Sequence, residues 1–329
     1  MKPREETRGR KAEQGKVQLP AKAAGKPDLA AIYRDAVRSR VLDGCFEAWT
    51  RAGLLGFALP ALEWGGVLAA ATAALQPADW LFPSARESRM AVWRGMPLEI
   101  YLAQHLGREL SGDGPKILPA FPGAVADAAR RVASVPGGPA SHLPQAVGAA
   151  QAMKLRKESA AVLAFCSGAA VDEPDFHVAL NFAGVWQAPV LVCVRLEPDE
   201  QRGFDVAARG AAYGLEGLAV DGAELDALAT DLAGALVEGK PRLVAVRKPG
   251  AEDGGLASLR RRLGNGSRPD DAALSREAER WCDAALASAR AAHLPAPATL
   301  ADGVYAVPPP ALGEELAAAL GGPVIPEDA

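Results

Sequence analysis

Apolar residues in the second half of the chain follow two alternating patterns. Short, almost purely apolar runs of strand length are separated by stretches in which apolar residues recur every three or four positions, as in a helix. The predicted helices cover residues 143–157, 176–185, 206–213 and 224–238, and the predicted strands cover residues 160–165, 189–194, 218–220 and 243–246. This strict alternation predicts an α/β fold in which a parallel sheet is flanked by crossover helices.

The first third of the chain has a different pattern, and no strand-like run appears before residue 150. Helical spacing begins after Asp28, a predicted N-cap, and returns in an alanine-rich run that ends at Leu75. The span from Gly53 to Leu75 is long enough to cross a bilayer, but Pro60 interrupts it, so we expect a buried loop followed by a helix. A helical N-terminal region is therefore predicted.

These patterns predict one large domain between two tails. The domain covers residues 28–321 and consists of a helical part (28–135), a parallel α/β part (136–248) and a C-terminal loop and helix (249–321). Within the last part, residues 250–269 are predicted to be a polar loop and residues 278–292 a helix. The charged segment 1–27 is expected to be a disordered N-terminal tail, and residues 322–329 a short C-terminal tail.

Charge gives no reason to expect a nucleic-acid partner, because the 329 residues carry a net charge of −4. The one basic run, Arg260 to Arg262, is followed by Asp270 and Asp271 and is interpreted as a solvated surface. The first 16 residues alternate in charge without an apolar core, so neither a signal peptide nor a membrane anchor is expected there.

The four cysteines, Cys45, Cys166, Cys193 and Cys282, are too widely spaced for a CxxC pair and too few for a disulfide framework. A reduced, cytoplasmic setting is therefore expected. Cys166 and Cys193 fall in or at the end of predicted strands, which favours buried, inert thiols.

Five segments, taken in order, carry a resemblance to one family. They are ADWLFP with RE and RGMP (residues 78–97), LPQAVGAA (143–150), DFHVALNFA (175–183), AAYG with VDG (211–222) and DGVYA (302–306). Together they resemble the alpha subunits of pyruvate and branched-chain 2-oxo acid dehydrogenases.

The resemblance implies the thiamine-diphosphate-binding fold, which agrees with the alternation of strands and helices. In that family the alpha subunit holds the diphosphate of the cofactor through Mg²⁺, and a beta subunit completes the site in a two-alpha, two-beta heterotetramer. Mg²⁺ requires oxygen ligands in near-octahedral positions. The family supplies them from a GDG sequence after one strand and an NN sequence after the next.

This chain departs from that pattern at the ligand positions. The GDG positions correspond to Ser167, Gly168 and Ala169, and the NN positions to Leu196 and Glu197. Gly168 thus replaces the metal-binding aspartate, and among these positions only Glu197 offers a side-chain carboxylate to a metal. We predict that this chain does not bind thiamine diphosphate or Mg²⁺.

Three further family positions are changed as well. The phosphate-contacting arginine is retained as Arg86, although Ala85 replaces the tyrosine before it. Phe121 replaces a catalytic histidine, and no histidine lies between Lys248 and Arg280, where the family has a second one. Arg86, Gly168, Ala169 and Glu197 are therefore predicted to form a vestigial cofactor site, and no catalytic or metal-binding residue is assigned.

Acidic residues near the same sheet edge leave an alternative open. Asp172, Glu173 and Asp175 are expected to cap the following helix and to stabilise its N-terminus through their negative charge. A relocated metal site is the other interpretation. Asp199 and Glu200 lie close in sequence to Glu197 and add negative charge. Such an edge is expected to repel a free diphosphate.

The histidines are interpreted as structural. His177 is expected to be a helix residue facing an interface, since spacing fixes no Ser, Cys or carboxylate partner for it. His142, next to the start of a predicted helix, is the better placed of the two for a functional role.

Three functions follow from these residues. The first is an alpha-type subunit that assembles with a beta-type partner but contributes little or no catalysis. The second is an active oxidative decarboxylase of a 2-oxo acid, in which Glu197 and acidic loop residues rebuild the metal site. The third is a scaffolding or regulatory protein that retains only the fold.

Overall fold

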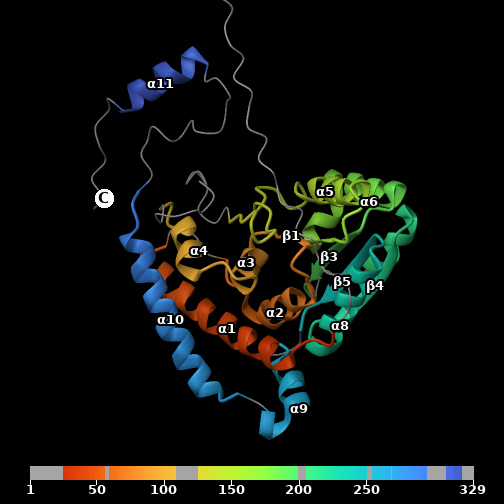
Figure 1. Ribbon diagram of the computed structural model, residues 1–329, viewed down its shortest axis with the longest axis horizontal. Coiled ribbons are helices and arrows are strands. Elements are labelled where there is room, and N and C mark those ends of the chain that lie inside the picture. Colours follow the sequence, from red (N-terminus) through yellow and green to blue (C-terminus); the bar gives the residue numbers. More distant parts are fainter. Residues whose placement is uncertain are drawn as a thin grey trace, which may run out of the picture.

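The computed structural model describes residues 25–55, 59–108, 125–198, 205–249, 254–267, 269–294 and 309–320. Within these ranges the centre of the molecule is a five-stranded parallel sheet with the strand order β1-β2-β3-β5-β4 (Figure 1). The strands are β1 (Trp80–Phe82), β2 (Val162–Ser167), β3 (Val190–Leu196), β4 (Glu216–Asp221) and β5 (Arg242–Arg247). The predicted parallel α/β sheet is confirmed.

Strand β1 corrects the prediction that no strand precedes residue 150. Trp80 to Phe82 pair with Val162 to Ala164 at the edge of the sheet. Three residues are too few to show a period of two in the sequence, and the strand exists because β2 offers it a partner. Its Leu81 also accepts a backbone hydrogen bond from Ala133 at 2.8 Å.

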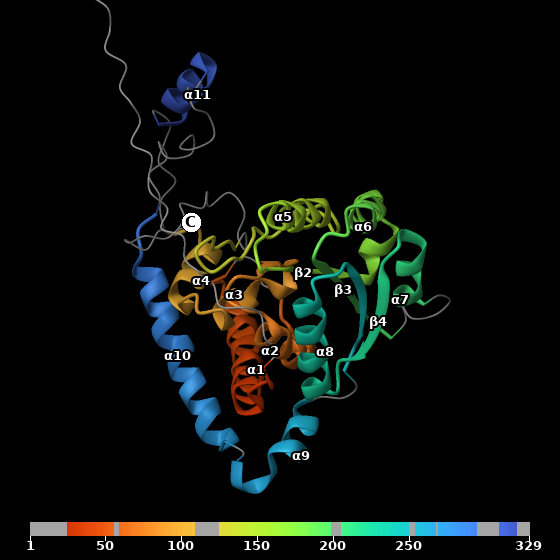
Figure 2. The ribbon, with the colours of Figure 1, turned by 45° about the vertical axis from the view of Figure 1, so that its right-hand side comes forward.

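Alternate residues of the central strands enter two separate cores, because successive side chains point to opposite faces of a sheet. On β2, for example, Leu163 and Phe165 belong to one core and Val162, Ala164 and Cys166 to the other. The first core contains residues of α1 (Leu29–Arg51), α2 (Gly65–Ala74), α4 (Leu98–His105), α8 (Leu225–Glu238) and α10 (Asp271–Ala291). The second contains residues of α5 (Leu143–Leu155), α6 (Pro174–Trp186) and α7 (Val206–Arg209). Figure 2 shows these two sets of helices on opposite sides of the sheet.

The helical N-terminal region is confirmed. Asp28 caps α1 and accepts hydrogen bonds from the backbone N–H groups of Ala30 and Ala31. The apolar span that ends at Leu75 forms α2, most of whose residues are buried. A short helix, α3 (Met90–Trp93), lies between β1 and α4. None of the described helices combines the length and hydropathy that a membrane crossing requires.

In two segments after residue 200 the structure differs from the predicted element in its boundaries or its type. The helix predicted for residues 206–213 divides into α7 and a 3₁₀ turn, Gly210–Tyr213. The polar loop predicted for residues 250–269 instead contains α9 (Leu256–Ser267), which kinks at Gly264, where φ is 60°. Leu256 and Leu259 of this helix are buried against the first core, and that contact outweighs the polar composition of the segment. The last described helix is α11 (Pro310–Leu320).

Helices α1 and α10, which lie far apart in the sequence, pack together (Figure 1). Arg260 of the basic run donates to Asp271 at 3.2 Å and to the Tyr33 hydroxyl at 3.1 Å, so this part of the run is neutralised by an ion pair. Cys45 of α1 and Cys282 of α10 are hydrogen-bonded, which lowers the pKa of Cys45. Sequence spacing did not reveal this thiol pair, since only the packing of α1 on α10 creates it.

Candidate functional site

The predicted cofactor positions gather at the carboxyl edge of the sheet. Because Ser167 pairs with Arg195 in register, Gly168 and Glu197 leave two adjacent strands at the same edge. Arg86 follows β1, and its charge lowers the pKa of Glu197, so these two side chains are electrostatic neighbours. Parallel α/β sheets bind their ligands at this edge.

Glu197 is held by residues of this chain. Its carboxylate accepts a hydrogen bond from the Trp64 indole N–H at 3.1 Å and forms an ion pair of 2.8 Å with the Lys248 ammonium. Burial raises the pKa of Glu197, but the hydrogen bonds from Lys248 and Trp64 and the nearby cations outweigh burial, and the pKa is lowered overall. Lys248 also lies 3.7 Å from Glu63. Glu197 is therefore an ionised carboxylate that already has its counter-charge.

Arg86 is also engaged within the chain. Its guanidinium donates to the Pro60 carbonyl oxygen at 2.9 Å. Burial lowers the pKa of Arg86, and the neighbouring charge of Arg195 lowers it further.

A buried ion pair lies beside Arg86 and was not predicted from the sequence. Glu87 pairs with Arg195, and both side chains are almost completely inaccessible. The Arg195 guanidinium also lies over the Trp64 ring, 5.4 Å from its centroid. The strand predicted for residues 189–194 ends before Arg195, whereas β3 extends through Leu196. A single arginine at the end of an apolar run was the only signal in the sequence for this contact.

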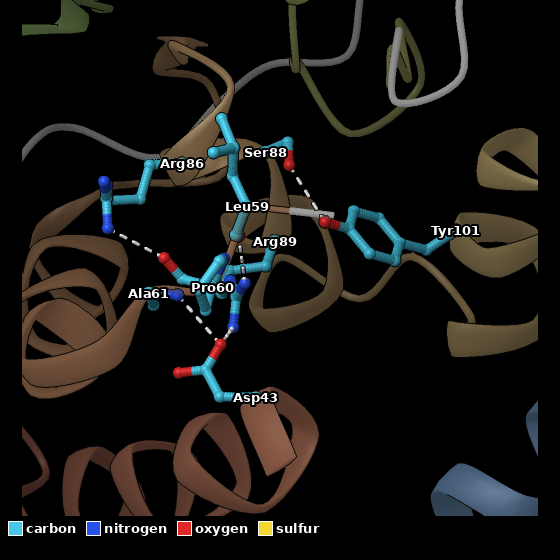
Figure 3. A network of polar contacts seen from close by, with 8 residues as sticks. All are labelled: Asp43, Leu59, Pro60, Ala61, Arg86, Ser88, Arg89 and Tyr101. Carbon is cyan, nitrogen blue, oxygen red and sulfur yellow. Dashed lines mark hydrogen bonds and ion pairs between the residues drawn. The ribbon is translucent and has the colours of Figure 1, made fainter. Parts of the chain in front are cut away.

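A second buried pair fixes the segment that Arg86 contacts (Figure 3). The Arg89 guanidinium pairs with the Asp43 carboxylate and donates to the Leu59 carbonyl oxygen at 2.8 Å. Asp43 also accepts from the Ala61 N–H at 2.8 Å. Residues 59–61 are thereby tied to α1 and to the turn after β1, and the carbonyl group of Pro60 is presented to Arg86.

Gly168 and Ala169 offer no side-chain oxygen to a cation. They begin a 3₁₀ turn, Gly168–Asp172, that follows β2 directly. Mg²⁺ requires about six oxygen ligands, and at the family positions only Glu197 has a carboxylate, which Lys248 and Trp64 already occupy. Within the described ranges, no group of three His, Cys, Asp or Glu residues is arranged to hold a metal. These residues do not fit a magnesium-bound diphosphate.

The acidic residues after β2 do not cap α6 as predicted. Glu173 occupies the N-cap position but its side chain makes no capping hydrogen bond, because a longer side chain does not fold back onto the first turn as Asp or Ser does. Asp175 lies in the first turn, where its charge is favourable. Asp172 lies 3.9 Å from Arg209. Asp199, Glu200, Phe121 and residues 302–306 lie outside the described residues.

Both histidines have local partners. His142 is buried and its Nε2 lies 2.6 Å from the Phe165 carbonyl oxygen, while burial lowers its pKa. His177 is exposed and its Nδ1 is hydrogen-bonded to the Tyr213 hydroxyl. Cys166 is buried as predicted, and burial raises the pKa of its thiol.

Comparison with known proteins identifies related sequences. The model of the dehydrogenase E1 component family matches residues 33–234. The mitochondrial 2-oxoisovalerate dehydrogenase subunit alpha 2 of Arabidopsis thaliana is 33% identical over 199 residues, which are 58% of this chain and 42% of the relative. The mitochondrial 2-oxoisovalerate dehydrogenase subunit alpha of Mus musculus is 26% identical over 276 residues, 81% of this chain and 60% of the relative. The chain therefore spans about half the length of these relatives.

Two solved structures are similar to parts of this chain. A transketolase from Campylobacter jejuni subsp. jejuni NCTC 11168 has a TM-score of 0.45 and 16% identity, covering 80% of this chain and 47% of its own. A putative thiamin diphosphate-dependent enzyme from Mycobacterium smegmatis has a TM-score of 0.39 and 14% identity, covering 56% and 31%.

The family match covers most of the helical region and all of β1, β2, β3 and β4. The matched region includes Arg86, Gly168, Ala169 and Glu197. The match supports the thiamine-diphosphate-binding fold that the motifs imply. The chain belongs to the dehydrogenase E1 component family.

Proposed function

We propose that this chain is the alpha-type subunit of a 2-oxo acid dehydrogenase of the pyruvate or branched-chain type. In this proposal it assembles with a beta-type subunit into a two-alpha, two-beta heterotetramer, and it contributes little or no catalysis because it does not hold thiamine diphosphate. Family membership and the alpha-subunit names of the relatives support the first part. A cytoplasmic location also stays a prediction.

The ion pair between Glu197 and Lys248 carries the second part. A metal ion that used Glu197 as a ligand would have to displace an ammonium group 2.8 Å away and an indole N–H 3.1 Å away. It would then find a glycine where the family has its metal-binding aspartate. Binding would thus replace satisfied contacts by an incomplete ligand set, which is unfavourable for a hard cation.

Titration calorimetry tests this proposal with the full chain, alone and co-purified with a beta-type subunit. We expect no Mg²⁺-dependent heat of thiamine diphosphate binding in either preparation. The matched control is the triple variant Gly168→Asp, Leu196→Asn and Glu197→Asn, which restores the oxygen ligands of the family pattern. Micromolar binding by the unaltered chain would overturn the proposal.

An activity measurement separates the inactive subunit from an active decarboxylase. The co-expressed subunits are incubated with pyruvate or branched 2-oxo acids, and reduction of an artificial electron acceptor is recorded. Turnover above that of the beta-type subunit alone would favour a rebuilt site. Purification of the chain without any beta-type subunit would instead favour the scaffolding function.

A further inference from the structure

Helices α1 and α10 are held in a fixed register by two polar contacts. The Tyr33 hydroxyl donates to the Asp271 carboxylate, and Arg38 donates to Glu277 at 2.9 Å. Because residue numbers rise on both helices from the first contact to the second, the two helices run in the same direction. Figure 1 shows them side by side along most of their length. The register therefore places the middle of α1 against the middle of α10.

This register brings Cys45 of α1 against Cys282 of α10, and their thiols are hydrogen-bonded. Cys282 is completely buried, whereas Cys45 is only half-buried. The other buried residues near Cys282 on α10 include Ala278, Ala285 and Ala289. These small side chains allow the backbone of α1 to approach α10 closely.

The spacing of two packed helices suits a disulfide. Helix axes lie ~8–10 Å apart, and each Cα atom lies ~2.3 Å from its own axis. Cα atoms that face each other directly are therefore roughly 3.5–5.5 Å apart, and a sideways offset adds to this separation. A disulfide joins Cα atoms about 4.4–6.8 Å apart. Oxidation of the pair thus requires no rearrangement of the two helices.

The remaining two cysteines cannot form such a pair. Cys166 of β2 and Cys193 of β3 lie on neighbouring strands, but their side chains enter opposite cores. Both are completely buried, and burial raises the pKa of each thiol. They therefore serve as internal standards for unreactive thiols.

Cys45 is the more reactive member of the pair. The hydrogen bond from Cys282 lowers the pKa of Cys45 and outweighs burial and the carboxylates of Asp283 and Glu279, which raise it. The same contact raises the pKa of Cys282. Because the thiolate is the nucleophile in thiol oxidation, Cys45 reacts first.

We propose that Cys45 and Cys282 are an oxidation-sensitive pair that closes into a disulfide when the chain meets hydrogen peroxide. The Cys45 sulfur attacks one peroxide oxygen and breaks the O–O bond, which yields a sulfenic acid on Cys45 and one water molecule. The Cys282 sulfur then attacks the Cys45 sulfur, the S–O bond breaks, and the hydroxyl group leaves as a second water molecule. Two electrons pass from the thiols to the peroxide, and both thiol protons end in water.

The disulfide joins α1 to α10 across a loop of about 240 residues, and such a long loop stabilises the native state by restricting the unfolded chain. Added thiols reverse the reaction by exchange. Zinc is not the ligand of this pair, because a structural zinc site takes about four ligands. In the described part of the chain no third His, Cys, Asp or Glu is grouped with the two thiols. The reaction requires neither thiamine diphosphate nor a beta-type subunit.

Peptide mapping by mass spectrometry tests the pair in the full chain. After treatment with hydrogen peroxide and alkylation of free thiols, digestion without reductant should yield a peptide that joins Cys45 to Cys282. Cys166 and Cys193 should be recovered as free thiols. The melting temperature should rise by at least about 5 °C and return to its first value after reduction. A folded, peroxide-treated chain without that peptide, or one with Cys45 joined to a second copy of the chain, overturns the inference.

Two variants separate the two steps. Cys282→Ala should stop the reaction at the sulfenic acid, which dimedone traps on Cys45, whereas Cys45→Ala should give neither a disulfide nor an adduct on Cys282. The matched control is Cys166→Ala, which removes a buried cysteine outside the pair and should leave disulfide formation unchanged. Circular dichroism melts verify that the variants are folded. A dimedone adduct on Cys282 in place of Cys45 contradicts the proposed order.

Alkylation of the unaltered chain needs no variant. Iodoacetamide should modify Cys45 at least about tenfold faster than Cys282, because Cys45 is both more exposed and more readily ionised. Equal rates, or faster modification of Cys282, would show that Cys45 is not the attacking thiol.

Discussion

Replacing Arg89 by Met should destabilise the fold strongly, because Arg89 and Asp43 form a buried ion pair. Their side chains are only 2% and 10% exposed. Met has a similar length but no charge, so Asp43 keeps the Ala61 N–H and loses its cation, and the Leu59 carbonyl oxygen loses its donor (Figure 3). Breaking a buried pair from one side costs about 3–5 kcal/mol.

The second half of the prediction concerns coupling. Asp43→Asn retains an acceptor for the Ala61 N–H but leaves Arg89 buried without a counter-charge, so it should also cost about 3–5 kcal/mol. In the double variant Asp43→Asn with Arg89→Met no charge is left buried and unpaired. The double variant should therefore be less destabilised than the sum of the single variants, by at least about 2 kcal/mol.

Urea unfolding followed by circular dichroism measures all three variants. The matched control is Arg51→Met, which removes an ion pair with Glu47 on the same helix, where both side chains are more than 70% exposed. That change should stay within about 0.5 kcal/mol. Single losses below about 1 kcal/mol, or strictly additive losses, would refute the view that the pair is desolvated and coupled.

Three further predictions concern other sites. Burial lowers the pKa of His105 to about 4, whereas an unfolded histidine titrates near 6.5. The free energy of unfolding should therefore fall by up to about 3 kcal/mol as the pH drops from ~6.5 to ~4. His105→Gln should reduce this pH dependence in unfolding curves recorded at different pH values. Gly184→Ala should destabilise by about 1–3 kcal/mol or more, because its Cβ would lie 1.7 Å from the Tyr213 carbonyl oxygen. Gly234→Ala, at a position of α8 with open space around it, should instead stabilise the fold by about 0.5–1 kcal/mol. Melting temperatures of the Gly184→Ala and Gly234→Ala variants that shift in the same direction would contradict this contrast. Lys248→Met should cost under about 1 kcal/mol, since the pair is partly exposed. The destabilisation by Lys248→Met should be present between about pH 4.3 and 10.4, where both groups of the ion pair are charged. It should vanish at lower pH, because the pKa of Glu197 is lowered and the ion pair is lost only as the pH falls through that pKa.

The sequence predicted the elements whose own residues determine them. Strand β3 is apolar along almost its whole length, and α8 ends at Glu238, where the predicted helix also ends. Gly239 follows it with φ at 65°. Strand β1 and helix α9 were missed because each depends on a distant contact. The first requires pairing with β2, and the second requires burial of Leu256 and Leu259.

The same distinction applies to the site. Motif positions identified Arg86 and Glu197, but their partners could not be found from spacing. Lys248 reaches Glu197 because β5 lies next to β3, and this strand order leaves no trace in hydrophobic periodicity. Arg195 pairs with Glu87 for a similar reason, because the turn after β1 lies beside the end of β3.

The covering of the sheet is unequal on its two faces, and this asymmetry connects the fold with assembly. On one face α8 packs against α2, and α2 is itself covered by α1, which packs against α10, so apolar side chains of these helices are enclosed. On the other face α5 and α6 form a single layer (Figure 2). A single layer leaves half of each helix facing solvent, where polar residues are expected, yet α6 presents Phe182, Val185 and Trp186. Selection for a monomer would remove such residues at little cost to the core, so their presence is best explained by a partner that supplies the missing layer.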